Sequence, residues 1–299
     1  MQVLVTGAGG LIGSHAVGIL HENGYPVVAL YRKLSDQDTV SPWRSLQGDL
    51  LDSNFVHTLD HIEFDLVVHC AAVLPDQFYG TRAEQAARAN LFIDEQVVNL
   101  CLEKGSRLVY LSGTSVYGIG SGSPLTENAR TSPIGPYVEA KVQSERRMLN
   151  ELAQSSTILR VSSAYGPGQR ARTVLRLFIE RSLAGLDLMY HGSGKREQDF
   201  IAAYDVARAI LCVVSNGRAS GVFNIAGGNP IFMRDLAELV ARTISGTKSK
   251  VMASGQPDPQ ENYKAAFDIS RARQTLGWHP TISLREGIVK WAEYLKGRR

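Results

Sequence analysis

Short apolar runs rich in β-branched residues alternate with helix-like patterns over the first 162 residues of this 299-residue chain. Runs such as Leu66-Val67-Val68 are apolar at every position, which is typical of strands buried on both faces of a parallel sheet. The expected strands are 2–6, 26–31, 46–48, 65–71, 107–112 and 157–162, and the helical patterns lie near 11–23, 83–104 and 137–154. The alternation predicts an α/β fold with a doubly wound parallel sheet.

Composition narrows the class of protein. Hydrophobic residues at 44% and charged residues at 20% are ordinary for a globular chain, and the net charge is 32 − 29 = +3 with scattered basic residues. This balance gives no support for a nucleic-acid or membrane surface. The chain starts on its first strand without a basic leader and has no apolar run near ~18 residues, so we expect a soluble cytoplasmic protein.

The three cysteines, Cys70, Cys101 and Cys212, lie far apart in apolar stretches, which favours buried free thiols. Neither they nor the seven histidines have the spacing of metal ligands, so we expect no metal site.

A glycine-rich loop links the first strand to the first helical pattern. Its glycines, Gly7, Gly10 and Gly13, are spaced G-x-x-G-x-x-G, with Leu11 and Ile12 opening the helix. Gly7 allows a tight turn, Gly10 lets the backbone approach a pyrophosphate, and Gly13 lets the helix pack on the strand. Unpaired N–H groups at the helix start then receive the negative charge. We therefore expect these five residues to bind a dinucleotide.

The end of the second expected strand bears on the choice of dinucleotide. A carboxylate at this place would bind the ribose hydroxyls of NAD and repel a 2′-phosphate. Arg32 and Lys33 stand there instead, and Arg32 can bind a phosphate with two parallel hydrogen bonds. The sequence favours NADP, and NAD remains an alternative.

Tyr137 and Lys141 lie four residues apart after Pro136, a residue that suits the first turn of a helix. Side chains at i and i+4 share one helix face. A phenol, with a reference pKa near ~10, is a poor acid or base at neutral pH unless a cation stabilises the phenolate. Lys141 is placed to provide that cation. Taken alone, the pair also fits two polar residues on a solvated helix face.

The pattern changes after residue 163. Glycine- and proline-rich loops surround a helix at about 172–184, a βα unit covers 205–226, and further helices lie near 233–245 and 284–296. We expect residues 1–163 and about 200–230 to form a dinucleotide-binding Rossmann domain. Residues 164–199 and 231–299 then form a smaller substrate-binding lobe.

Several segments together resemble the extended short-chain dehydrogenase/reductases, and more narrowly their nucleotide-sugar epimerase/dehydratase branch. The segments are the glycine loop, Gly48-Asp49-Leu50, His69-Cys70-Ala71-Ala72, Ser112-Gly113-Thr114-Ser115-Val116-Tyr117-Gly118, Tyr137-x-x-x-Lys141, Tyr165-Gly166-Pro167-Gly168-Gln169, Gln198-Asp199-Phe200-Ile201 and Leu276-Gly277-Trp278-His279-Pro280. The resemblance covers nearly the whole chain.

The resemblance implies roles for these residues. Tyr137 exchanges a proton with a substrate oxygen, and Lys141 lowers the pKa of Tyr137 and binds the nicotinamide ribose. Hydride moves between the nicotinamide and a carbon that bears an alcohol or ketone. The resemblance further implies a homodimer formed through the helices near 83–104 and 137–154. The remaining cofactor contacts that it implies are Asp49, Leu50, Ala71, Ala72 and Ser112.

The chain departs from the family at Gly113, where relatives carry a Ser or Thr that bonds the reacting oxygen. Thr114, Ser115 or Ser112 could supply the hydroxyl instead. If the strand continued, Thr114 and Ser112 would share one face, opposite Ser115. We favour Thr114 as the catalytic hydroxyl and expect Ser115 to contact substrate.

Related dehydratases carry an Asp-Glu pair where this chain has Thr114-Ser115, and related decarboxylases carry a Glu at the Ser115 position. Water elimination therefore lacks its proton carriers, and reduction, oxidation or epimerisation at one carbon remains.

Binding of a nucleotide sugar needs cations for its diphosphate. Ser163 stands where many relatives have Asn, Gln198 replaces an Arg, and the loop 258–262 lacks a cation. Arg172 and Arg196 are our candidate substrate contacts together with Ser163.

The first hypothesis is an enzyme that reduces a keto group of a nucleotide sugar. The alternatives are a redox-neutral epimerase acting at one sugar carbon and a reductase of a non-sugar carbonyl. A cofactor-binding regulator with a decayed active site is a further alternative, against which Tyr137 and Lys141 argue.

Overall fold

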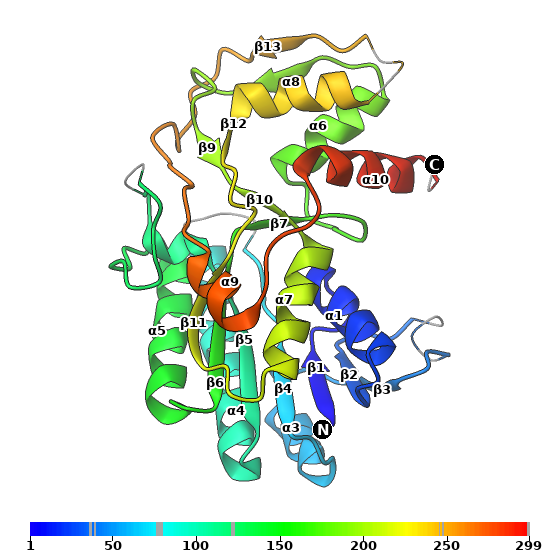
Figure 1. Ribbon diagram of the computed structural model, residues 1–299, viewed down its shortest axis with the longest axis vertical. Coiled ribbons are helices and arrows are strands. Elements are labelled where there is room, and N and C mark those ends of the chain that lie inside the picture. Colours follow the sequence, from blue (N-terminus) through cyan, green and yellow to red (C-terminus); the bar gives the residue numbers. More distant parts are fainter. Residues whose placement is uncertain are drawn as a thin grey trace.

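The computed structural model describes residues 1–35, 38, 40–75, 80–120, 123–244, 246 and 248–297. It shows a larger α/β lobe and, at the carboxyl ends of its strands, a smaller lobe (Figure 1). The amino terminus lies at the far end of β1, so the strands of the sheet run toward the smaller lobe.

The larger lobe is built on a seven-stranded sheet of order β11-β6-β5-β4-β1-β2-β3, and all its neighbouring strands pair in parallel. The strands are β1 Val3–Thr6, β2 Val27–Tyr31, β3 Arg44–Gln47, β4 Leu66–His69, β5 Arg107–Gly113, β6 Ser156–Val161 and β11 Gly221–Ile225. The expected doubly wound parallel sheet is confirmed. β5 runs one residue further than expected, and β3 lies about two residues earlier.

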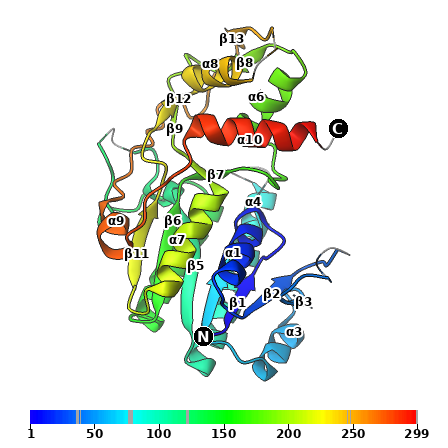
Figure 2. The same ribbon diagram turned by 45° about the vertical axis from the view of Figure 1, so that its right-hand side comes forward.

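Helices cover both faces of this sheet (Figure 2). On one face, α1 Leu11–Glu22 packs against α7 Ala203–Ser215, with α9 Ser270–Leu276 beside α7. On the other face, α4 Thr81–Lys104 packs along α5 Pro136–Glu151, and α3 Ser53–Thr58 lies near the sheet edge. Alternate residues of the central strands enter one of two hydrophobic clusters, one for each face, which is why those strands carry continuous apolar runs, whereas the edge strand β3 is mostly polar.

The smaller lobe has its own hydrophobic cluster, in which α6 Val174–Leu183, α8 Met233–Thr243 and α10 Leu284–Lys296 surround Phe178 and Trp291. Three short strand pairs belong to this region: β7 Ser163–Tyr165 with β10 Phe200–Ala202, β8 Leu188–Tyr190 with β13 Val251–Ala253, and β9 Glu197–Gln198 with β12 Ile231–Phe232. The short pairs carry no periodicity long enough to be recognised in the sequence. The limits of the two-domain division stay a prediction.

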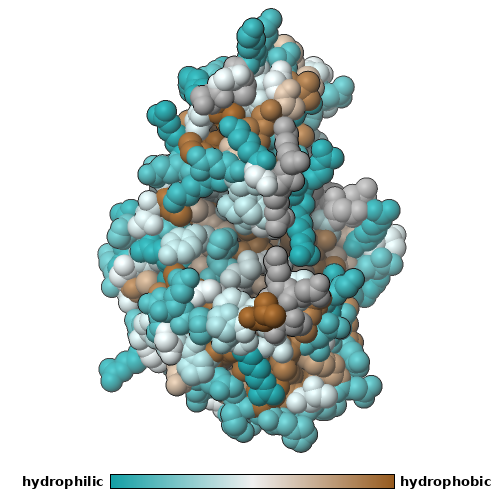
Figure 3. Space-filling view, turned by 90° about the vertical axis from the view of Figure 1, so that its right-hand side faces the viewer, coloured by the Kyte–Doolittle hydropathy of each residue, from teal (hydrophilic) through white to brown (hydrophobic). Residues whose placement is uncertain are grey.

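The surface is mainly hydrophilic on the face shown in Figure 3, where hydrophobic residues are scattered in small groups. Among the described residues, no helix combines the length and apolar character needed to cross a membrane. Within the same ranges, no three His, Cys, Asp or Glu side chains are grouped so that they could hold a metal ion. All three cysteines are free thiols; Cys101 is buried, whereas Cys70 and Cys212 are half-buried.

Candidate active site

The glycine loop lies between β1 and α1, at the carboxyl edge of the sheet. Gly7 has a φ of +66°, and a Cβ there would lie 2.7 Å from the backbone of Ala71. A Cβ at Gly13 would lie 2.2 Å from the carbonyl oxygen of Gly7. Both positions therefore require glycine. Gly10 caps α1, whose first turn carries no acidic residue, so its N–H groups are free of a competing carboxylate. These features fit an anionic cofactor group.

The other expected cofactor residues follow the ends of neighbouring strands. Arg32 follows β2 and is exposed, and Asp49 follows β3, where its carboxylate accepts the N–H of Leu51 at 3.0 Å. Leu50 is buried, Ala72 is exposed, and the N–H of Ala71 donates to Thr6 Oγ1 at 3.3 Å. Because β3, β2, β1 and β4 are adjacent in the sheet, these residues share one edge with the glycine loop.

Tyr137 and Lys141 lie in the first turns of α5, which Pro136 begins as expected. Tyr137 is half-buried and Lys141 is 5% exposed, so the pair does not belong to a solvated helix face. Burial, together with the negative charge of Asp94, raises the pKa of Tyr137 to about 12. The phenol therefore holds its proton at neutral pH. The lowering of this pKa by Lys141 stays a prediction.

The ammonium of Lys141 points at neighbouring strand β5. Its Nζ donates to the hydroxyl of Tyr110 at 2.8 Å and to the carbonyl oxygen of Leu111 at 3.3 Å. Nζ also lies 4.4 Å from the centre of the Tyr110 ring, which adds a cation–π contact. An ammonium has three N–H donors, so one remains for Tyr137 or a cofactor hydroxyl.

The turn that follows β5 differs from the expected continuation of the strand. β5 ends at Gly113, and Thr114–Tyr117 forms one turn of 3₁₀ helix, so alternation of faces does not apply there. Thr114 is 5% exposed and its hydroxyl contacts the hydroxyl of Tyr263. Ser115 is exposed, and its Oγ lies 3.3 Å from where a Cβ of residue 113 would be.

Ser112 does not offer a free hydroxyl. Its Oγ donates to Glu145 Oε1 at 2.5 Å in a buried setting, so only its backbone is left for a cofactor. Thr114 and Ser115 therefore remain the two candidates for the hydroxyl that Gly113 lacks.

Two of the three expected substrate contacts, Ser163 and Arg196, are already paired with protein groups. Ser163 Oγ accepts a hydrogen bond from Gln198 Nε2. Arg196 forms an ion pair with Asp258 at 3.0 Å and donates to Gln260 Oε1 at 2.9 Å. The loop 258–262 thus contributes a carboxylate that neutralises Arg196. Arg172 lies in the loop before α6 and is exposed.

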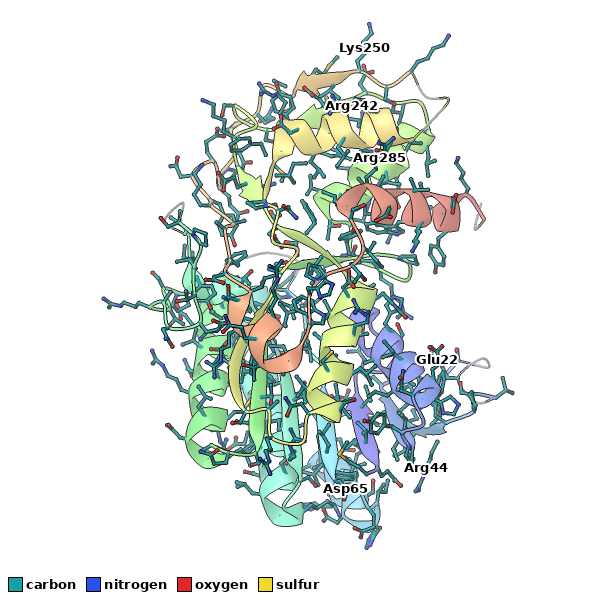
Figure 4. The ribbon with its side chains drawn as sticks, viewed as in Figure 1. Glu22, Arg44, Asp65, Arg242, Lys250 and Arg285 are labelled. Carbon is teal, nitrogen blue, oxygen red and sulfur yellow. The ribbon has the colours of Figure 1, made fainter. Side chains whose placement is uncertain are left out.

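Other charged side chains lie away from this region. In Figure 4, Arg242, Lys250 and Arg285 lie on the smaller lobe near its outer surface, whereas Glu22, Arg44 and Asp65 lie around the base of the larger lobe. They are ordinary surface charges.

Sequence reasoning missed three residues of this site: Asp94, Tyr110 and Tyr263. Asp94 could have been noticed, because it follows Asn90 by four residues on the apolar face of the helix 83–104, where a carboxylate needs a partner. Tyr110 looks like any aromatic residue of a buried strand. Tyr263 lies in an irregular loop 149 residues after Thr114, so only the fold brings the two side chains together.

Comparisons with known proteins agree with this geometry. Residues 3–226 match the NAD dependent epimerase/dehydratase family. The dTDP-D-glucose 4,6-dehydratase of Mus musculus is 28% identical, with 99% of this chain and 88% of the relative covered. The putative UDP-glucose 4-epimerase of Methanocaldococcus jannaschii is 27% identical, with 99% and 98% covered.

Solved structures are similar over the full length. The UDP-glucose 4-epimerase of Thermotoga maritima, determined with UDP-glucose, has a TM-score of 0.90 at 26% identity, covering 100% of this chain and 99% of that one. MoeE5, determined with UDP-glucuronic acid and NAD, has a TM-score of 0.88 at 30% identity and full coverage of both chains. The chain belongs to the NAD-dependent epimerase/dehydratase family, whose members are extended short-chain dehydrogenase/reductases acting on nucleotide sugars. It is therefore an NAD(P)-dependent enzyme of that family.

Proposed function

We propose that the protein reduces a keto group, most simply that of a nucleotide sugar, with Tyr137 as the proton donor. The observation that carries this proposal is the placement of the Tyr137 phenol in the first turn of α5, one helical turn before the buried ammonium of Lys141, which β5 holds in place. A protonated phenol can give its proton to a carbonyl oxygen. In the reducing direction, activity is then lost as the pH rises through the pKa of Tyr137.

The residues present fit a nicotinamide dinucleotide. The glycine loop and the start of α1 would hold its pyrophosphate, and Lys141 has one N–H left for a ribose hydroxyl. When bound, the nicotinamide supplies the hydride. Tyr137 supplies the proton to the oxygen, and Thr114 or Ser115 supplies a hydroxyl that orients that oxygen. Neither Thr114 nor Ser115 can serve as a carboxylate acid or base, which supports reduction over water elimination.

A second candidate, a reductase of a carbonyl compound without a diphosphate, has specific support in the smaller lobe. Arg196 is neutralised by Asp258, and Ser163 is bonded to Gln198. A diphosphate would have to compete with these contacts for its cation. Of the three expected substrate contacts, exposed Arg172 is then the cation available to bind the diphosphate of a nucleotide sugar.

A substrate panel tests the proposal. The protein is incubated with NADPH or NADH and keto forms of UDP- and dTDP-sugars, together with small ketones and aldehydes of similar size. We expect nicotinamide oxidation with at least one keto sugar. Isomer interconversion without a change in nicotinamide absorbance would support the epimerase alternative instead. Turnover of small carbonyls alone would support the second candidate, a reductase of carbonyl compounds without a diphosphate. Failure with every compound would support the alternative of a cofactor-binding regulator without catalytic activity.

We also propose a preference for NADP over NAD, supported by exposed Arg32 directly after β2, where the sequence places Arg32-Lys33. Arg32→Ala should raise the KM for NADPH by about tenfold or more, since charge-assisted hydrogen bonds contribute about 1.5–3 kcal/mol, and should leave the KM for NADH unchanged. Arg44→Ala, which removes an exposed cation at the base of the lobe, is the matched control. A clearly lower KM for NADH than for NADPH in the wild type contradicts this preference.

We further propose that the chain forms a homodimer through α4 and α5. A groove of about 260 Å³ runs between these helices, lined by Leu91, Glu95, Val98 and Arg147 among others. Light scattering of the full chain measures the assembly.

A further inference from the structure

A row of buried polar side chains crosses three adjacent strands beneath the proposed active site. Thr6, His69 and Tyr110 are register partners on β1, β4 and β5, and all three are at most 1% exposed. Asp94, 3% exposed, reaches this row from α4. The surrounding strand positions are apolar, so four polar groups here need a reason.

The hydrogen bonds of this row run in one direction. Ala71 N–H donates to Thr6 Oγ1 at 3.3 Å, and Thr6 Oγ1 lies 2.6 Å from His69 Nδ1. His69 Nε2 lies 3.0 Å from Asp94 Oδ1. A carboxylate only accepts, so Nε2 carries a proton, and in the neutral imidazole Nδ1 then accepts from the Thr6 hydroxyl. The chain of hydrogen bonds therefore ends with His69 Nε2–H donating to the carboxylate of Asp94.

Asp94 also orients Tyr110. The Tyr110 hydroxyl donates to Asp94 Oδ2 at 2.7 Å, so its own oxygen lone pair faces Lys141 Nζ at 2.8 Å. Burial, with the charge of Asp94, raises the pKa of Tyr110 well above its ordinary value, so Tyr110 keeps its proton. Lys141 thus meets an acceptor whose direction Asp94 determines.

We propose that Asp94 is a positioning residue, which through Tyr110 holds the Lys141 ammonium in place and keeps it protonated for the reaction. This inference rests on the proposed function, in which Lys141 assists Tyr137. Asp94 is buried beneath the proposed site and acts through Tyr110 and its own charge.

Charges around Lys141 support this role. Burial lowers the pKa of Lys141, and Asp94, Glu145 and Cys70 oppose that effect in this order. Glu145 is engaged by Arg160 at 2.6 Å, and burial raises the pKa of the Cys70 thiol to about 12, so Cys70 is neutral. His69 of β4 and Tyr137 of α5 are the other titratable groups around this cluster. Burial would raise the pKa of Asp94, but Lys141 and His69 lower it to about 2. Asp94 is therefore the ionised carboxylate that stabilises the charge of Lys141.

The test follows the titration of Lys141 itself, which needs no substrate. The full chain is labelled with ¹³Cε-lysine, the Lys141 resonance is assigned with Lys141→Arg, and its pKa is measured by NMR in the wild type and in Asp94→Asn. We expect the pKa of Lys141 to fall by about one pH unit or more, since an opposite charge within a few ångströms shifts a pKa by about 1–3. An unchanged Lys141 titration in Asp94→Asn overturns the proposal.

Two further variants separate positioning from folding. Asp205→Asn alters another buried carboxylate, which bonds Thr281 and Ile282 beside α7, and should leave the Lys141 titration unchanged whatever it does to stability. Tyr110→Phe keeps the ring and Asp94 but removes the acceptor of Lys141. It should lower kcat about tenfold, on the scale of one hydrogen bond to a charged group, with KM nearly unchanged.

If Asp94→Asn does not fold, Tyr110→Phe decides the question, and wild-type kcat in that variant overturns the proposal.

Asp94→Asn should also shift the loss of reductase activity at high pH toward lower pH, because it removes a charge that raises the pKa of both Tyr137 and Lys141. If the wild type turns over no panel compound, the proposed function fails, whereas the NMR titration still decides whether Asp94 keeps Lys141 protonated.

Discussion

Tyr137→Phe should reduce turnover of any active carbonyl substrate by about 10²–10⁴-fold, the usual contribution of a positioned general acid. The variant removes one hydroxyl from a half-buried ring in the first turn of α5, so the fold and the packing of Val138 are kept. Binding of NADPH or NADH, followed by nicotinamide fluorescence, should be retained, because the glycine loop and Lys141 are unchanged. Steady-state kcat is the measurement.

A matched control removes a tyrosine hydroxyl far from the site. Tyr25 OH lies 3.1 Å from Ser215 Oγ near the amino ends of the strands, and Tyr25→Phe should keep wild-type turnover. Near-normal turnover of Tyr137→Phe would show that the proton comes from elsewhere, with Thr114 and Tyr263 as the next groups to examine.

Glu145→Gln should lower the free energy of unfolding by about 3–5 kcal/mol, because it leaves a buried guanidinium without its counter-charge. Glu145 is 2% exposed, and its carboxylate accepts from Arg160 at 2.6, 3.1 and 3.2 Å and from Ser112 at 2.5 Å. Arg160 also donates to the hydroxyl of Tyr117 at 2.9 Å and lies over its ring. The pair therefore ties α5, β5 and β6 together. Urea unfolding with a constant m-value gives the change.

The same helix offers an exposed comparison. Glu151 pairs with Arg147 at 2.9 Å, but both side chains are at least 31% exposed. Glu151→Gln should change the free energy of unfolding by less than about 1 kcal/mol, as exposed pairs usually do. Equal effects of the two substitutions would mean that the Glu145–Arg160 pair is not the anchor that its geometry indicates.

The sequence predicts the larger lobe well because its signals are local. Continuous apolar runs, a glycine loop whose spacing is dictated by sterics, and a proline before Tyr137 each act within a few residues. These signals suffice for the doubly wound parallel sheet, the helix that carries Tyr137 and Lys141, and the family.

The remaining features depend on distant residues. The surroundings of Lys141 are set by Asp94 and Tyr110, 47 and 31 residues before it in the sequence. Arg196 and Asp258 pair although they lie 62 residues apart in the sequence, so no local pattern predicts the ion pair. After Gly113 the expected strand gives way to a 3₁₀ turn, whose start the residues 114–117 do not reveal by periodicity. Roles assigned to single residues of the site therefore stay predictions.

The row of Thr6, His69 and Tyr110 also has a meaning for how the chain folds. Strands that are apolar on both faces, such as Val3-Leu4-Val5-Thr6 beside Leu66-Val67-Val68-His69, can slide past one another with little change in hydrophobic burial. A slip of one residue would point the polar side chains to the opposite face, away from Asp94, where they would be buried without partners. The polar row thus specifies the register of the central strands, so that the same contacts give correct strand pairing and correct placement of Lys141.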